Sequence, residues 1–75
     1  MAGTRYVIAE NLKRMLVDKK LGANRCADGA GVSRSQFYEV LAARTTPTID
    51  WLERVAHELE TEVWKLAQPY KRKAR

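Results

Sequence analysis

The sequence predicts an all-α domain built from five short helices. Apolar residues recur three and four positions apart in several separate stretches, which is the spacing of a helix with one buried face. No stretch shows the apolar–polar alternation that is typical of a β-strand. Residues that start or stop helices separate these stretches: Gly22, Gly31, Ser33, Pro47 and Thr48. With 75 residues, the chain has room for one small core.

The first two helices are predicted over residues 6–20 and 23–30. The first carries an apolar stripe formed by Ile8, Leu12, Met15 and Leu16. We expect Leu21-Gly22 to break it. The second helix turns Cys26, Ala27 and Ala30 inward. Gly31 can then adopt the left-handed conformation of a tight turn, with Val32 facing the core.

Ser33 is predicted to cap a third helix that continues to about residue 43. Its spacing places Phe37, Val40 and Leu41 inside. The outer surface then carries Arg34, Ser35, Tyr38, Glu39 and Ala42. The loop from Arg44 to Pro47 follows, because the residue before a proline is disfavoured in a helix.

The last two helices are predicted after Thr48, which caps the fourth, and over residues 62–68. The buried stripe of the fourth helix is Ile49, Leu52, Val55, Ala56 and Leu59. Pro69 ends the fifth helix. We therefore expect one domain over residues 1–68, followed by a basic tail over residues 69–75 that we expect to be flexible.

Composition argues against several classes of protein. The single Cys26 excludes an intramolecular disulfide, and one cysteine with one histidine cannot supply the ligands of a zinc site. A structural role is favoured over a catalytic pair for Cys26 and His57, and no nucleotide-binding glycine pattern is present. We expect no enzymatic activity, no cofactor and no metal. Without a long apolar run or a signal-peptide pattern, we expect a soluble, cytoplasmic protein.

Charge is distributed unevenly along the chain. Residues 1–48 hold eight Lys and Arg against four Asp and Glu, whereas residues 49–68 hold two against five. The tail adds Lys71, Arg72, Lys73 and Arg75. A basic front half is typical of a protein that offers one face to a polyanion. The tail is either an arm that contacts phosphates or a solubilising end.

Two short helices joined by a glycine turn, over residues 23–43, describe a helix-turn-helix. In such a motif the second helix enters the major groove of DNA, and its first residues reach the base edges. Arginine suits a guanine edge, serine either type of base, and glutamine an adenine. These preferences make Arg34 and Ser35 the leading candidates for base contact. Gln36 lies one position round from the outermost face, so we expect it at the phosphates or at the edge of the groove.

Over residues 8–67 the sequence resembles the phage Cro/CI-type, or XRE, helix-turn-helix regulators. The resemblance is carried by Leu21, Ala27, Ala30-Gly31-Val32-Ser33-Arg34-Ser35, Pro47-Thr48-Ile49, Leu52, Ala56, Leu59 and Leu66. It implies a compact, five-helix, lambda-repressor-like DNA-binding domain. It places base reading on Arg34, Ser35 and Glu39, with Gln36 and Tyr38 beside them. It also implies contacts from the loop over residues 44–46, including Arg44 and Thr45, with the DNA backbone.

The sequence departs from this family at several positions. Gly22-Ala23 replaces the usual Ser-Gln at the start of the second helix, so a side-chain phosphate contact is missing. The backbone N–H groups at that helix start, with Asn24 and Arg25, are candidates for phosphate contact instead. Ser33 is a further candidate DNA-binding residue. Leu16 and Leu41 replace an ion pair with an apolar contact, and Ala43 replaces a glycine.

The two tryptophans, Trp51 and Trp64, match family positions that are commonly polar, so we expect both to be partly exposed. Trp64, with Val63 or Tyr70, is a candidate dimer contact; the alternative is that Trp64 packs back on the core.

The resulting hypothesis is a dimeric transcriptional regulator, a repressor that reads a palindromic operator in double-stranded DNA. One alternative is an antitoxin-type autoregulator that also binds a small protein partner through the acidic residues 49–68. The other is a helical protein-interaction module that does not bind DNA.

Overall fold

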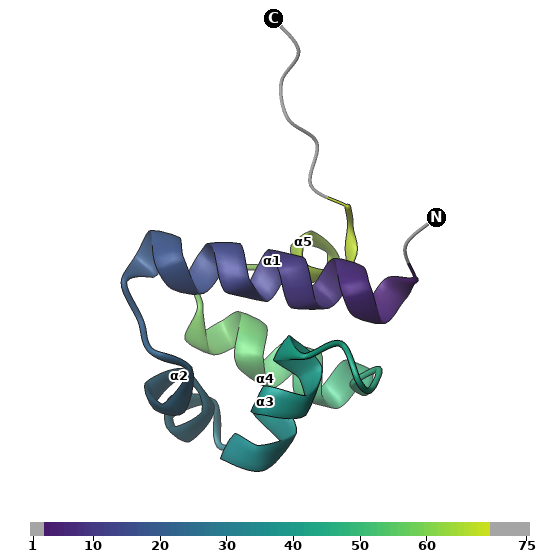
Figure 1. Cartoon of the computed structure of the whole chain (residues 1–75). Helices are drawn as coiled ribbons and strands as arrows, with labels where there is room; N and C mark the ends of the chain where they lie inside the picture. Colours follow the sequence, from purple (N-terminus) through teal and green to yellow (C-terminus); the bar gives the residue numbers. More distant parts are fainter. Residues whose placement is uncertain (1–2, 70–75) are drawn as a thin grey trace, which may run out of the picture.

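The computed structural model describes residues 3–69 and folds them into five α-helices with no strand among them (Figure 1). The helices are α1 (Thr4–Lys19), α2 (Ala23–Ala30), α3 (Arg34–Leu41), α4 (Ile49–Glu58) and α5 (Val63–Ala67). The predicted all-α class is confirmed, and helix ends differ from the predicted ones by no more than two residues. Within residues 3–69, no helix has the length and apolar character needed to cross a membrane.

The helix starts follow the predicted local signals. The Ser33 hydroxyl accepts a hydrogen bond from the backbone N–H of Gln36 at 3.2 Å, which caps α3. The Thr48 hydroxyl accepts one from the N–H of Trp51 at 3.1 Å, which caps α4. Gly31 adopts the predicted left-handed conformation, with φ of 73°. The turn between α2 and α3 is therefore fixed on both sides by residue types suited to it.

The break after α1 lies one residue earlier than predicted. α1 ends at Lys19, and Lys20 is its C-cap, with a left-handed φ of 55°. The expected break was at Leu21-Gly22. The N–H of Leu21 donates to the Leu16 carbonyl at 2.9 Å, and the Leu21 side chain packs against the core. Gly22 has extended backbone angles and stands at the start of α2. A hydrogen-bonded helix end thus replaces the expected glycine break.

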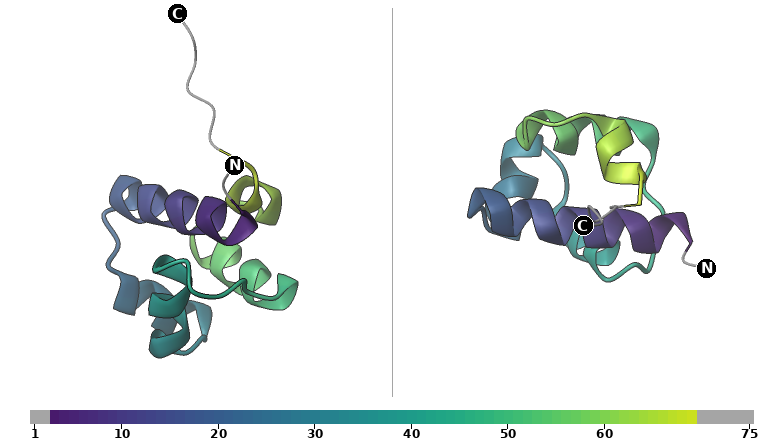
Figure 2. Two further views of the ribbon diagram at one scale, coloured as in Figure 1. Left: turned by 45° about the vertical axis from the view of Figure 1, so that its right-hand side comes forward. Right: turned by 90° about the horizontal axis from the view of Figure 1, so that it is seen from above.

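The core lies where α1 packs across α3 and α5, and where α2 and α5 pack on α4 (Figure 2). Leu12, Phe37 and Leu59 are among its fully buried side chains. Cys26 is also fully buried, which raises the pKa of its thiol to about 11, with the nearby Glu58 adding to the shift. The predicted structural position of Cys26 is confirmed. Leu16 is buried and Leu41 packs against the same core.

Two predictions about α4 were wrong. Trp51 was expected to be partly exposed but is buried, with 4% of its surface accessible. Its ring packs against Phe37 of α3, with ring centroids 5.5 Å apart. Ile49 was expected in the buried stripe but is 64% exposed. At the first turn of α4, the large Trp51 ring supplies the contact with α3, and Ile49 is left on the surface.

Asn11 is a buried polar residue that the sequence pattern did not reveal. It lies on α1 with 1% of its surface accessible. Its side-chain amide Nδ2 donates to the backbone carbonyls of Leu66 at 2.6 Å and Gln68 at 2.8 Å, with a longer contact of 3.3 Å to Lys65. Its Oδ1 accepts from Arg14 at 2.9 Å. Asn11 therefore satisfies carbonyl groups at the end of α5 and joins that helix to α1.

Ala43 lies two residues after the end of α3 and adopts a left-handed conformation, with φ of 59°. Such a backbone is costly for any residue with a Cβ atom. We therefore expect Ala43→Gly to raise the free energy of unfolding by about 0.5–1 kcal/mol, with the melting temperature rising by several degrees. The neighbouring Ala42 has an ordinary φ of −84°, so Ala42→Gly is the matched control and should destabilise the protein. Thermal unfolding followed by circular dichroism measures both; equal effects in the two variants would show that Ala43 carries no strain.

Candidate nucleic-acid interface

The candidate interface is the outer face of α3 together with the adjoining side of α2. The opposite face of α3 is fixed in the core by Phe37 and Val40, both fully buried. Arg34, Ser35 and Tyr38 are exposed, as predicted. The Ser33 cap places Arg34 and Ser35 in the first turn of a helix whose position is set by packing. α2 and α3 lie together at one end of the molecule, away from α5 (Figure 1).

Arg34 is joined to Asp28 of α2 by two hydrogen bonds. Its Nε donates to Oδ1 at 3.0 Å, and its Nη2 donates to Oδ2 at 2.6 Å. The side chains are 57% and 54% exposed, so both remain in contact with solvent. Hydrogen bonding from Arg34 lowers the pKa of the Asp28 carboxyl, and the same bond raises the pKa of Arg34. The guanidinium of the leading base-contact candidate therefore has a charged partner within the protein.

A second link between the two helices lies one turn further along α3. The Tyr38 hydroxyl donates to Oδ1 of Asn24 at 2.9 Å. Residues 34 and 38 are four apart on α3, and residues 24 and 28 are four apart on α2, so each pair lies on one helix face. These four side chains link α2 to α3. Asn24 was predicted to contact phosphates; in this structure it accepts a hydrogen bond from Tyr38.

Glu39 and Arg44, both predicted to contact DNA, are paired with each other. Arg44 Nη1 lies 3.3 Å from Glu39 Oε2, with the two side chains 69% and 46% exposed. The pair connects α3 to the loop that follows it. Thr45, in the same loop, is half-buried. This exposed pair is joined by one hydrogen bond, and not by two as Arg34 and Asp28 are, so a stronger partner can displace it.

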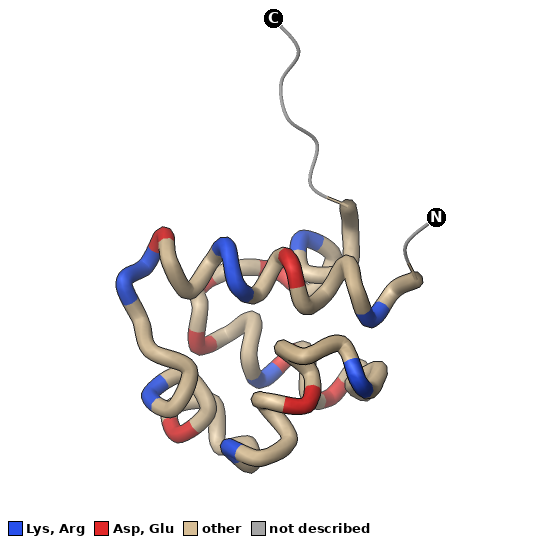
Figure 3. The backbone as a smooth tube through the Cα atoms, viewed as in Figure 1, with Lys and Arg blue, Asp and Glu red and all other residues tan. Residues whose placement is uncertain are grey.

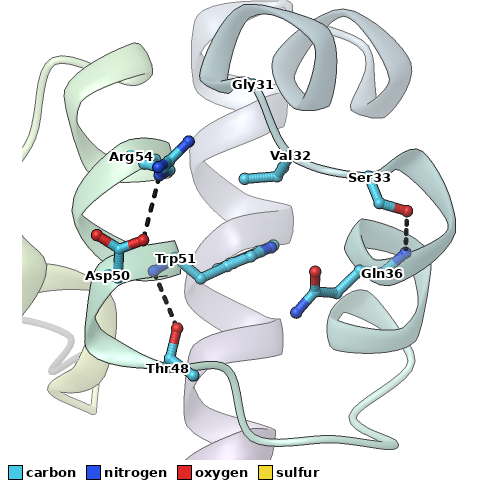
Figure 4. Close-up of a pocket in the computed structure, with 8 residues that line it drawn as sticks. All are labelled: Gly31, Val32, Ser33, Gln36, Thr48, Asp50, Trp51 and Arg54. Atoms are coloured by element: carbon cyan, nitrogen blue, oxygen red, sulfur yellow. Dashed lines mark hydrogen bonds and ion pairs between the residues drawn. The ribbon is translucent and has the colours of Figure 1, made fainter.

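Gln36 lies at one edge of a shallow pocket between α3 and α4 (Figure 4). Its side chain and the ring of Trp51 extend toward each other from the two helices. Within residues 3–69, the Trp51 indole Nε1 is buried without a hydrogen-bond partner. Arg54 and Asp50 line the other side of the pocket and pair at 3.3 Å. Gln36 is thus turned toward α4, and not toward the outermost surface of α3.

Charge around α2 and α3 is more mixed than the basic front half of the sequence suggested. In sequence order, Arg25, Arg34 and Arg44 alternate with Asp28 and Glu39. Blue and red segments are correspondingly mixed in this part of the backbone (Figure 3). Arg25 is exposed near the start of α2. The region therefore carries a small positive excess, and two of its three arginines are in ion pairs.

Two of the three predicted dimer residues, Trp64 and Val63, lie within the described part of the chain. Trp64 is 57% exposed, so the alternative in which it packs back on the core is wrong. Its Nε1 donates to Glu62 at 2.8 Å, and the Lys65 ammonium lies 5.5 Å from its ring centroid. Val63 is half-buried against the core. Tyr70 and tail residues 70–75 lie outside the described residues.

Asp28 is the member of the site that the sequence reasoning missed. An acidic residue just before the Gly31 turn and an arginine just after it are six positions apart. That spacing predicts no contact on one helix, and it becomes a contact only because the turn folds α3 back beside α2. The available signal was the pair of opposite charges flanking a predicted tight turn.

No family model, no curated protein and no solved structure matches this chain. The case for a function therefore depends on the geometry and chemistry of the surface described above.

Proposed function

We propose that this chain is a sequence-specific, double-stranded DNA-binding transcriptional regulator with a lambda-repressor-like helix-turn-helix fold. The observation that carries the proposal is the start of α3. Arg34 and Ser35 are exposed in the first turn of a capped helix whose other face is fully buried. A helix held in this way can place side chains at base edges without first being ordered on DNA.

In this proposal α2 and α3 are the two helices of the motif, and Gly31 is the turn. α3 has eight residues and is about 12 Å long. An α-helix with its side chains is about 10–12 Å in diameter, which fits the width of the major groove. Arg34 and Ser35 then contact base edges. Arg25 and the loop at Arg44 contact phosphates on either side. Glu39, released from Arg44 when that arginine turns to a phosphate, accepts a hydrogen bond from a cytosine.

The proposed regulator acts as a dimer. Trp64 is a large aromatic side chain exposed on α5, and tryptophan is a frequent anchor of protein interfaces. Two-fold symmetry then requires a palindromic operator with its half-sites one helical turn, about 34 Å, apart. A dimer bound to such an operator competes with other proteins for the same DNA, which is how a repressor acts.

The test is selection from a random duplex library with the full chain, followed by a salt titration on the enriched duplex. We expect two half-sites related by a dyad. Because the proposal assigns three arginines to the DNA, the logarithm of the binding constant should fall with the logarithm of salt concentration at a slope of about −2 to −4 per protomer.

Three results would overturn or change the proposal. If no duplex is enriched, the chain is better explained as a helical protein-interaction module. If a small protein partner copurifies and binds through residues 49–68 while DNA selection still succeeds, the antitoxin-type autoregulator is favoured. A single half-site without a dyad would remove the dimer and keep the DNA-binding module.

A further inference from the structure

The hydrogen bonds between Asp28 and Arg34 leave part of the guanidinium unused. An arginine carries five N–H donors in one plane. Asp28 accepts from Nε and from one N–H of Nη2, along one edge of the group. The two N–H groups of Nη1 and the second N–H of Nη2 remain, at the tip of the side chain. One donor from each of these nitrogens points forward in parallel, which is the geometry that the O6 and N7 atoms of guanine require.

The stability of α2 and α3 does not explain why Asp28 and Arg34 occupy these positions. Arg34 is the first residue of α3, where the partial positive charge of the helix end disfavours a cation. Asp28 lies in the last turn of α2, where the partial negative charge disfavours an anion. Each side chain is more than half exposed, so the pair itself adds little to folding. The pair instead fixes the direction of the long, flexible Arg34 side chain on the exposed face of α3.

We propose that Asp28 is a positioning residue that holds the Arg34 guanidinium with its tip directed away from α2, ready to contact one guanine, and that it discriminates against DNA lacking that guanine. This inference rests on the proposed function. Without Asp28, Arg34 samples several directions and can turn to the nearest phosphate. With it, the side chain loses less freedom on binding the base, and the carboxylate repels phosphates when the base contact is not made.

The test compares Asp28→Asn and Asp28→Ala with the unchanged protein, on the selected duplex, on its single-base variants and on a scrambled duplex of equal length. An amide in place of the carboxylate keeps one acceptor oxygen and loses the second. We expect the preference for guanine at the position read by Arg34 to fall roughly two- to tenfold. Affinity for the scrambled duplex should rise, because one negative charge has been removed.

Two controls separate positioning from a general charge effect. Asp18→Asn removes the same charge from an exposed site on α1 and should leave the base preference unchanged. In an Arg34→Ala background, Asp28→Asn should also leave it unchanged, because no guanidinium remains to be positioned. Circular dichroism checks that each variant is folded.

Different outcomes identify different failures. If Asp28→Asn raises affinity for the selected duplex and sharpens its preference, Asp28 masks Arg34 and the positioning role is overturned. An unchanged preference at every base pair also overturns it, while leaving the proposed function intact. If the library yields no preferred duplex, both the proposed function and this inference fail.

Discussion

Replacing Asn11 with alanine should lower the free energy of unfolding by about 3 kcal/mol. The change removes the donor that serves the carbonyls of Leu66 and Gln68 at 2.6 and 2.8 Å. Asn11 is 1% exposed, so water cannot readily replace its amide there. A chain of this length has a total stability of roughly 4–11 kcal/mol. The loss is therefore a large share of the whole.

The matched control is Glu10→Ala, one residue earlier on the exposed side of α1. Its effect should stay within about 0.5 kcal/mol of zero. Urea denaturation compares the two variants, and amide hydrogen exchange in α5 shows whether the loss begins at that helix. If Asn11→Ala and Glu10→Ala unfold at the same urea concentration, Asn11 does not join α5 to α1 in the way described.

Local signals account for most of the fold. Ser33 and Thr48 predicted helix starts, and Gly31 predicted the turn, because each acts through its own backbone or hydroxyl on residues within a few positions. Asn11 could not be found in this way, since the carbonyl groups that its amide donates to lie 54 to 57 residues further along the chain. Helical spacing predicts which apolar residues are buried. It does not predict that a polar residue on the same face, such as Asn11, is buried with them.

Trp51 shows a second limit. Its expected exposure came from the residue type usual at that position in the resembling family, whereas its burial follows from contact with Phe37. The size of one ring at the start of α4 determines whether Trp51 or Ile49 turns inward, and periodicity alone does not encode that choice.

The candidate site was predicted as a set of outward-facing residues, and Arg34, Ser35 and Tyr38 do face outward. Their pairing was not predicted. Asp28 and Asn24 meet Arg34 and Tyr38 only after the turn has brought α2 and α3 together. A sequence shows which side of a helix a residue occupies. The partner that holds a side chain in place comes from the neighbouring helix.

The change expected to affect DNA binding most is Arg34→Ala. If Arg34 contacts one guanine through two hydrogen bonds, its loss should weaken binding to the selected duplex roughly five- to a hundredfold and relax the preference at one base pair. Thermal stability should hardly change, because the Arg34–Asp28 pair is exposed. Competition binding on the selected duplex and its three variants at that base pair measures both the affinity and the preference.

Arg34→Lys and Arg25→Ala determine whether that loss comes from the base contact or from charge. Lysine keeps the positive charge and lacks the planar fork, so Arg34→Lys should lose most of the base preference while the salt dependence stays unchanged. Arg25, exposed on α2, is expected to contact a phosphate. Its removal should weaken binding to all duplexes alike and reduce the salt slope by about one. If Arg34→Ala behaves as Arg25→Ala does, Arg34 contacts the DNA backbone, and base reading must come from Ser35 and Glu39, since α3 exposes no other arginine.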